Sequence, residues 1–164
     1  MTPGTARDLA TAIARREITA EKLMEDTLAR IAGANPSLNA IVSPRGADAL
    51  LAEARACDKA DAAGPLHGLP LAVKDLADAA RLPTSQGSPA FAGQVAQADS
   101  PHVARLRAGG AIVTAKTNTP EFGMGSNTYN PVFGRTANPY DPSRSCGGSS
   151  GGAAVALATG MTVL

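Results

Sequence analysis

The sequence contains no tryptophan, and aromatic residues make up only 3% of its 164 positions. A core with so few rings must be built from alanine, leucine, valine and isoleucine, and the 44% hydrophobic content is sufficient for one domain. No uninterrupted apolar run approaches the roughly 18 residues that a membrane-spanning helix needs. The N-terminal stretch carries acidic residues and no long apolar segment, unlike a signal peptide. We therefore expect a cytoplasmic protein with no membrane partner.

Cysteine and histidine are also scarce, and neither acidic nor basic residues dominate. Two cysteines, Cys57 and Cys146, are too few for a disulfide framework in a chain of this length. His67 and His102 lie far apart in the sequence and have no neighbours at metal-ligand spacing, so no metal site is predicted. The 15 basic and 14 acidic residues leave a net charge of +1, which gives no reason to expect nucleic acid as a partner.

The first part of the chain, residues 1–64, is predicted to be an N-terminal helical region. Apolar residues recur at helical spacing in three segments, and a short apolar stretch between the second and the third is typical of a strand. We place the helices at 5–16, from Thr19 to a stop at Gly33 and Pro36, and at 46–63, with the strand at 39–43.

Residues 65–164 differ in pattern, because short apolar runs now alternate with helical segments. The runs are bounded by glycine or charged residues, as buried strands are. We place strands at 69–73, at 111–115 and starting at 161–164, and helices at 101–109 and from Gly152 onward. This order predicts an α/β fold with a partly parallel sheet.

Four interpretations compete for the segment Gly147–Gly152, which reads GGSSGG. A flexible linker has this composition, but an apolar helix follows without a break. A phosphate-binding loop needs a lysine after its glycines, and none follows Lys116. A nucleophile elbow needs a histidine after its serine, and none follows His102. The fourth interpretation is serine chemistry with a lysine as the base.

Lys74 is the best candidate for that lysine. It ends an apolar strand, so its ammonium group should be partly removed from water, which lowers the pKa. The alternative is an ordinary surface charge pair between Lys74 and Asp75 at a strand end. Composition alone favours this alternative, because solvated lysines greatly outnumber catalytic ones.

Four stretches of the chain together resemble the N-terminal part of the amidase signature family. They occur in the family's order and with similar spacing, which is far more specific than any one motif. The stretches are GLPLAVKD (68–75), HVARLRAGGAIVTAKTNTPEFGMGSNT (102–128), NPVFGRTANPYDPSR (130–144) and GGSSGG (147–152). The resemblance favours a catalytic Lys74 over the surface charge pair.

The resemblance implies a fold and an activity. The expected fold is the N-terminal part of an α/β/α sandwich with a mixed central sheet, preceded by N-terminal helices, so that residues 1–164 form a partial amidase domain. The family hydrolyses or transfers small-molecule carboxylic amides through an acyl-serine intermediate, using a Ser–cis-Ser–Lys triad and no cofactor. By this resemblance Lys74 is the catalytic lysine, and Ser149 is the bridging serine that follows a cis peptide bond.

Further residues receive roles from the same resemblance. Gly148 limits side-chain crowding before the cis bond. Ser150 is either a hydrogen-bonding partner in the site or a simple cap for the helix that follows. Gly123, Gly125 and Ser126 match a segment that lines the substrate's path in relatives, although an ordinary helix end would read in the same way.

The family's acylated serine is not in this sequence, because no serine follows Ser150. The resemblance therefore implies that the nucleophile and the oxyanion hole lie beyond Leu164, and that this truncated chain is inactive alone. An incomplete sheet should also promote self-association. Three functions stay open: a stand-alone amidase, the glutamine-amidase component of a tRNA-dependent amidotransferase, and a non-catalytic remnant that acts as a binding or structural protein.

Overall fold

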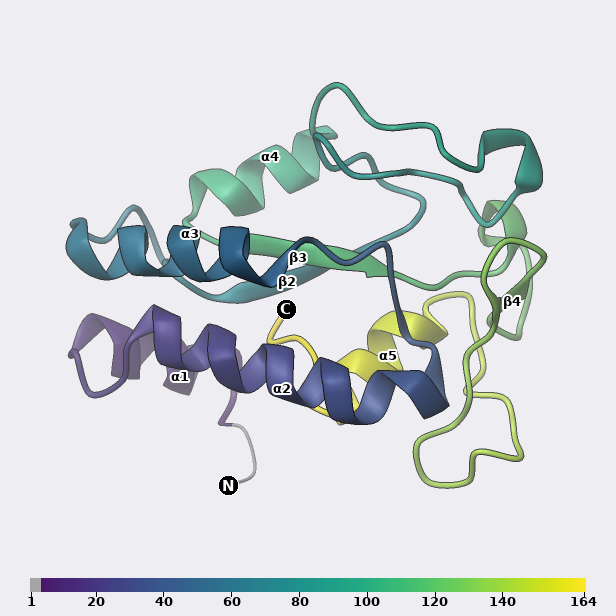
Figure 1. Ribbon diagram of the computed structural model, residues 1–164, viewed down its shortest axis with the longest axis horizontal. Helices are drawn as coiled ribbons and strands as arrows, with labels where there is room; N and C mark the ends of the chain where they lie inside the picture. The colour runs from purple at the N-terminus through teal and green to yellow at the C-terminus, as the bar shows by residue number, and fades with distance from the viewer. Residues whose placement is uncertain (1–3) are drawn as a thin grey trace.

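The computed structural model describes residues 4–164, in which helices surround a small sheet (Figure 1). The helices are α1 (Ala6–Ala14), α2 (Ala20–Leu38), α3 (Ala47–Lys59), α4 (Pro101–Ala108) and α5 (Gly151–Ala158), and the strands are β1 (Ile41–Val42), β2 (Pro70–Lys74), β3 (Ile112–Thr117), β4 (Tyr129–Asn130) and β5 (Gly134–Arg135). Two short 3₁₀ turns span Pro89–Phe91 and Glu121–Gly123. None of the helices in residues 4–164 has the length and apolar character to cross a membrane.

The central sheet has the strand order β1-β3-β2. Strands β2 and β3 run parallel, with α4 in the connection between them, and β1 pairs with β3 in the antiparallel direction. Lys74 at the end of β2 stands opposite Thr117 at the end of β3. The α/β fold with a mixed sheet is thereby confirmed.

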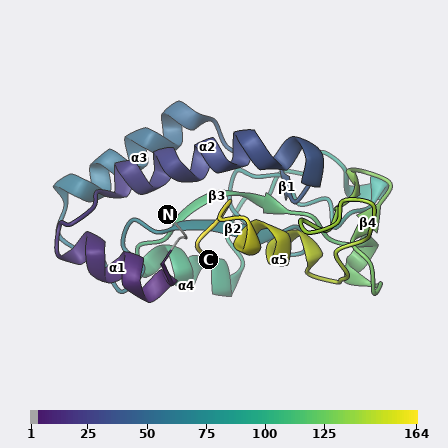
Figure 2. The same ribbon diagram turned by 90° about the horizontal axis from the view of Figure 1, so that it is seen from below.

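Helices cover both faces of this sheet. Alternate residues of a strand face opposite sides, so Leu71 and Val73 pack with Val103 of α4, whereas Ala72 packs with α5. Figure 1 shows α4 on one side of β2 and β3, with α2 and α5 on the other. Figure 2 shows α2 and α3 side by side, where Met24 and Leu50 share a buried cluster. Few of these contacts need an aromatic ring, as the composition predicted.

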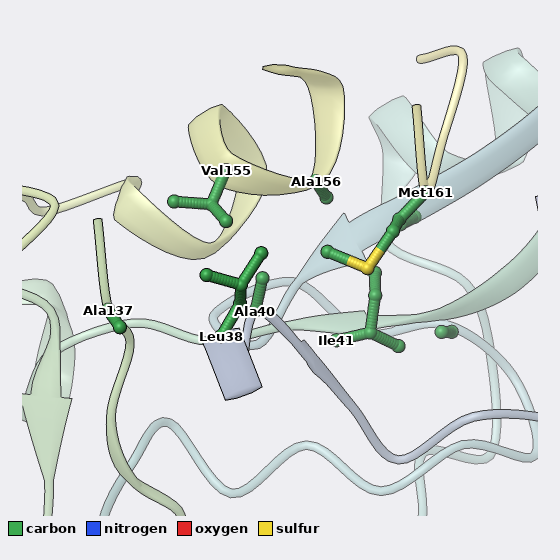
Figure 3. Close-up of a cluster of buried hydrophobic side chains, with 9 residues drawn as sticks. Leu38, Ala40, Ile41, Ala137, Val155, Ala156 and Met161 are labelled. Carbon is green, nitrogen blue, oxygen red and sulfur yellow. The ribbon is translucent and has the colours of Figure 1, made fainter. Parts of the chain in front are cut away.

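The contact between α5 and the rest of the core is built from small side chains. In Figure 3, Val155 and Ala156 of α5 lie against Leu38, Ala40 and Ile41, all of them buried. Gly152 brings the helix still closer, because a side chain there would overlap backbone atoms of Asn118 and lie 2.9 Å from the Ala40 carbonyl oxygen. Glycine and alanine thus bring the start of α5 close to the start of β1 and the end of β3.

The predicted stop of the second helix at Gly33 and Pro36 is wrong, because α2 continues to Leu38. Gly33 is exposed and tolerated within the helix, and burial of Leu38 in the core keeps the last turn helical past the proline. The helix ends instead at Asn39, which adopts a left-handed conformation with φ of 51°. The Asn39 amide donates to the carbonyl oxygen of Asn35 at 2.8 Å.

Other predicted boundaries also need correction. The first helix ends at Ala14 rather than at residue 16, and the strand predicted at 39–43 covers only Ile41–Val42. Helix α3 ends at Lys59 rather than at residue 63. Strand β3 continues past residue 115 through Lys116 and Thr117, because both side chains are buried. Residues 161–164 are not a regular strand, although Val163 donates to Pro70 and Leu164 accepts from Ala72. This segment covers part of the edge of β2, and self-association stays a prediction.

We expect Gly152→Ala to lower the free energy of unfolding by about 1–3 kcal/mol, because its methyl group has no room beside Asn118. The matched control is Gly33→Ala, whose methyl group would meet no atom within 4 Å. It should raise the free energy of unfolding by about 0.5–1 kcal/mol through helix propensity. Urea denaturation measures both. Equal effects of the two changes would contradict close packing at Gly152.

Candidate active site

Lys74 lies at the carboxyl end of β2, where open α/β sheets usually bind their ligands. Its ammonium nitrogen Nζ donates to Oγ of Ser149 and to Oγ of Ser150, both at 2.9 Å. Partial burial lowers the pKa of Lys74, as its position at the end of an apolar strand predicted. The sheet and the GGSSGG segment therefore meet at one amine flanked by two hydroxyl groups.

The segment that carries Ser149 has an unusual backbone. The peptide bond between Gly148 and Ser149 is cis, as the family resemblance implied. A side chain at Gly148 would lie 3.1 Å from the Gly125 carbonyl oxygen and 3.1 Å from the carbonyl carbon of Asn127. Glycine at this position lets the loop pack against residues 125–127, which agrees with the predicted need to limit crowding.

Ser150 directly precedes α5, but its side chain makes no capping hydrogen bond. Its hydroxyl group accepts from Lys74 instead. Of the two alternatives for this serine, the simple helix cap is wrong, and a hydrogen-bonding partner of the lysine is what the structure contains.

Asp75 does not pair with Lys74, so the surface charge pair is also wrong. Its buried carboxylate accepts from the Ser85 hydroxyl at 2.5 Å and lies 3.5 Å from Nζ of Lys116. Lys116 is completely buried and donates to Oγ1 of Thr84 at 3.0 Å. Burial lowers the pKa of Lys116, and the carboxylate of Asp75 partly offsets that effect.

Sequence reasoning missed Lys116 as a buried partner, because its strand was predicted to end at residue 115 and the lysine that follows was given no role. A signal was present, since Asp75 follows one predicted strand and Lys116 follows the next. Opposite charges at matching ends of two adjacent parallel strands can meet inside the protein, where an unpaired charge is strongly unfavourable.

The predicted substrate segment lies beside the serine loop, which is the turn Gly147–Gly151 that carries Ser149. Gly123 ends a 3₁₀ turn with φ of 72°, and a side chain there would lie 2.6 Å from Cδ1 of Leu76. Gly125 and Ser126 are exposed, and the Gly125 carbonyl faces Gly148. The segment therefore packs against Gly148, the residue before Ser149, through its backbone. Binding of a substrate by Gly123, Gly125 and Ser126 stays a prediction.

The arrangement is suited to moving protons. A neutral lysine can accept a proton from Ser149, which can accept one from a third hydroxyl group on its other side. Residues 4–164 contain no group of three or more histidine, cysteine or acidic side chains placed to hold a metal ion.

A model of the family described as Amidase matches residues 22–164, which include every residue of this site. The chain belongs to the amidase family. The matched region covers most of the chain and contains Lys74, Ser149 and Ser150.

Individual relatives agree with this assignment. A glutamyl-tRNA(Gln) amidotransferase subunit of Nitratidesulfovibrio vulgaris is 46% identical over 152 residues, which cover 92% of this chain and 31% of that protein. Indoleacetamide hydrolase of Bradyrhizobium diazoefficiens is 44% identical over 161 residues, which cover 96% of this chain and 30% of that protein. This chain therefore spans about a third of the length of these relatives.

Solved structures show the same fold. The peptide amidase of Stenotrophomonas maltophilia superimposes with a TM-score of 0.88 at 35% identity, over 98% of this chain and 35% of the other. A 6-aminohexanoate cyclic dimer hydrolase gives a TM-score of 0.87 at 31% identity, over 97% of this chain and 32% of the other. The amidase amino acid pattern and the amidase fold thus occur together.

We expect Lys74 to lose its proton at a lower pH than an ordinary lysine, because burial disfavours the charged ammonium group. Lys22 is the opposite case, since its hydrogen bond to Asp26 raises its pKa. NMR titration of ¹³Cε-labelled lysines measures both, with Lys74→Arg to assign the signal. A Lys74 that titrates at or above the ordinary lysine pKa of 10.5 would contradict its burial in the site.

Proposed function

We propose that this chain is the N-terminal part of an amidase that hydrolyses small-molecule carboxylic amides to an acid and ammonia or an amine. Lys74 is the general base, and Ser149 relays protons between Lys74 and a nucleophilic serine. The observation that carries this proposal is the 2.9 Å hydrogen bond between Nζ of Lys74 and Oγ of Ser149, in a chain of the amidase family.

The proton movements follow from this geometry. Neutral Lys74 takes the proton of Ser149 while Ser149 takes the proton of the nucleophilic serine, whose oxygen attacks the amide carbon. The same path returns a proton to the departing nitrogen as the C–N bond breaks, leaving an acyl-serine ester. Water then attacks this ester along the same path and releases the acid. A lowered pKa of Lys74 favours the neutral amine that the first step needs.

The nucleophilic serine of this scheme is not among the described residues after Ser150. We propose that polypeptide outside the present 164 residues supplies it, together with the donors that stabilise the oxyanion. The 164-residue chain by itself should then release no ammonia from amides. Activity of the purified chain that depends on Lys74 would contradict this part of the proposal.

A second candidate is the glutamine-amidase component of a tRNA-dependent amidotransferase. The 46% identity to a glutamyl-tRNA(Gln) amidotransferase subunit favours it, whereas the 44% identity to an indoleacetamide hydrolase favours a stand-alone amidase. A non-catalytic remnant is the least favoured function, since it has no need for a partly buried lysine held between two serines.

We expect Lys74→Ala and Ser149→Ala each to lower kcat/KM for amide hydrolysis by roughly 10²–10⁴-fold, since each removes a step of proton transfer. The variants are made in the complete polypeptide that carries these residues in its source cells, once its intact mass is known. The measurement is ammonia release. Lys59→Ala, an exposed lysine at the end of α3, is the matched control and should be neutral.

The choice of substrate separates the two enzymatic candidates. Hydrolysis of aromatic or aliphatic primary amides by the complete polypeptide alone supports a stand-alone amidase. Ammonia release from glutamine that requires added partner proteins supports the amidotransferase component. Full activity of the Lys74 and Ser149 variants would refute both.

A further inference from the structure

The loop that carries Ser149 is held by a hydroxyl group that spans it. Oγ1 of Thr128 donates to the Gly147 carbonyl oxygen at 2.8 Å and accepts from the Gly151 amide at 3.0 Å. These two partners lie on either side of Ser149 in the sequence. Thr128 is completely buried, so its hydroxyl group ties both ends of the Gly147–Gly151 turn to one point.

A second buried hydroxyl group holds the bridging serine itself. Oγ1 of Thr119 donates to the backbone carbonyl oxygen of Ser149 at 3.3 Å. The backbone of Thr119 is in turn fixed, because its amide donates to Oδ1 of Asn118 at 3.0 Å and its carbonyl accepts from Nδ2 of Asn130 at 2.7 Å. Asn118 directly follows β3, so this hydroxyl group takes its position from the central sheet.

We propose that Thr119 and Thr128 are positioning residues that hold Ser149 against Lys74. Lys74 projects from the end of β2, and Thr119 lies just beyond the end of the neighbouring strand β3. The separation of amine and hydroxyl therefore depends on the pairing of two strands and on these two threonines. The catalytic meaning of this inference rests on the proposed function, whereas the hydrogen bonds themselves do not.

The same segment also adjoins the predicted substrate residues. Gly148 packs against the backbone of Gly125 and Asn127, two residues that lie between Thr119 and Thr128 in the sequence. Residues 119–128 thus hold the serine loop from one side and present Gly123, Gly125 and Ser126 on the other. A shift of this segment would displace Ser149 and the substrate segment together.

Titration of Lys74 provides a readout of this positioning that needs no substrate. Burial is the cause that lowers the pKa of Lys74, and Asp75, the adjacent carboxylate, is engaged by Ser85 and Lys116 instead. If the serine loop moves away, water reaches the ammonium group and its pKa rises towards the ordinary value. A change in the pKa of Lys74 therefore reports the loss of the Thr119 or the Thr128 hydroxyl group.

The test uses Thr119→Val and Thr128→Val in the 164-residue chain, since valine keeps the shape of threonine and removes the hydroxyl group. The NMR titration of ¹³Cε-labelled lysines should show a higher pKa for Lys74 in each variant. Thr119→Ser and Thr128→Ser restore the hydroxyl group and should restore the original titration. The matched control is Thr27→Val, which removes a buried hydroxyl group bonded to Leu23 within α2 and should leave Lys74 unchanged.

The proposal is wrong if both folded valine variants leave the Lys74 titration unchanged, or if Thr27→Val shifts it equally. If a valine variant fails to fold, the alanine variant at the same position replaces it. If all these variants fail to fold, the two threonines are merely structural and the proposal is wrong. An inactive complete polypeptide would refute the proposed function and leave this titration result intact. The two failures are therefore distinguishable.

Discussion

Parallel pairing of β2 with β3 is the constraint on which the rest of this structure depends. It places Lys74 opposite Thr117, and it brings the residues that follow each strand to the same edge of the sheet. The Asp75 amide continues the pairing by donating to the Thr117 carbonyl oxygen at 3.0 Å. Both the lysine–serine contact and the buried ion pair behind it exist because these two strand ends coincide.

Two lysines at this edge have opposite environments. Lys116 is sealed within the protein against Asp75, where loss of either partner would leave an unpaired buried charge, typically destabilising by about 3–5 kcal/mol. Lys74 has no carboxylate partner in the described structure and contacts two hydroxyl groups. The ion pair with Asp75 stabilises the charge on Lys116. Lys74, which contacts hydroxyl groups instead, has an amine that can exchange a proton. The same residue type thus stabilises the fold in one case and, in the proposed function, transfers protons in the other.

Small residues allow this site to form. Glycine at 148 and 152 permits backbone contacts that a side chain would block, so the serine loop and the start of α5 come close to the end of β3. Buried threonine side chains then satisfy carbonyl and amide groups of that irregular loop. The scarcity of aromatic residues fits an architecture that depends on close backbone approach.

The sequence by itself determined the α/β architecture, the approximate positions of the main strands and helices, and the family. It also indicated Lys74 and Ser149 as candidates, because hydrophobic periodicity and ordered motifs are local signals. Only the tertiary structure decided that α2 continues past Pro36, that Asp75 pairs with Lys116, and that two buried threonines hold the serine loop. These features depend on burial and on partners distant in sequence, which local patterns do not specify.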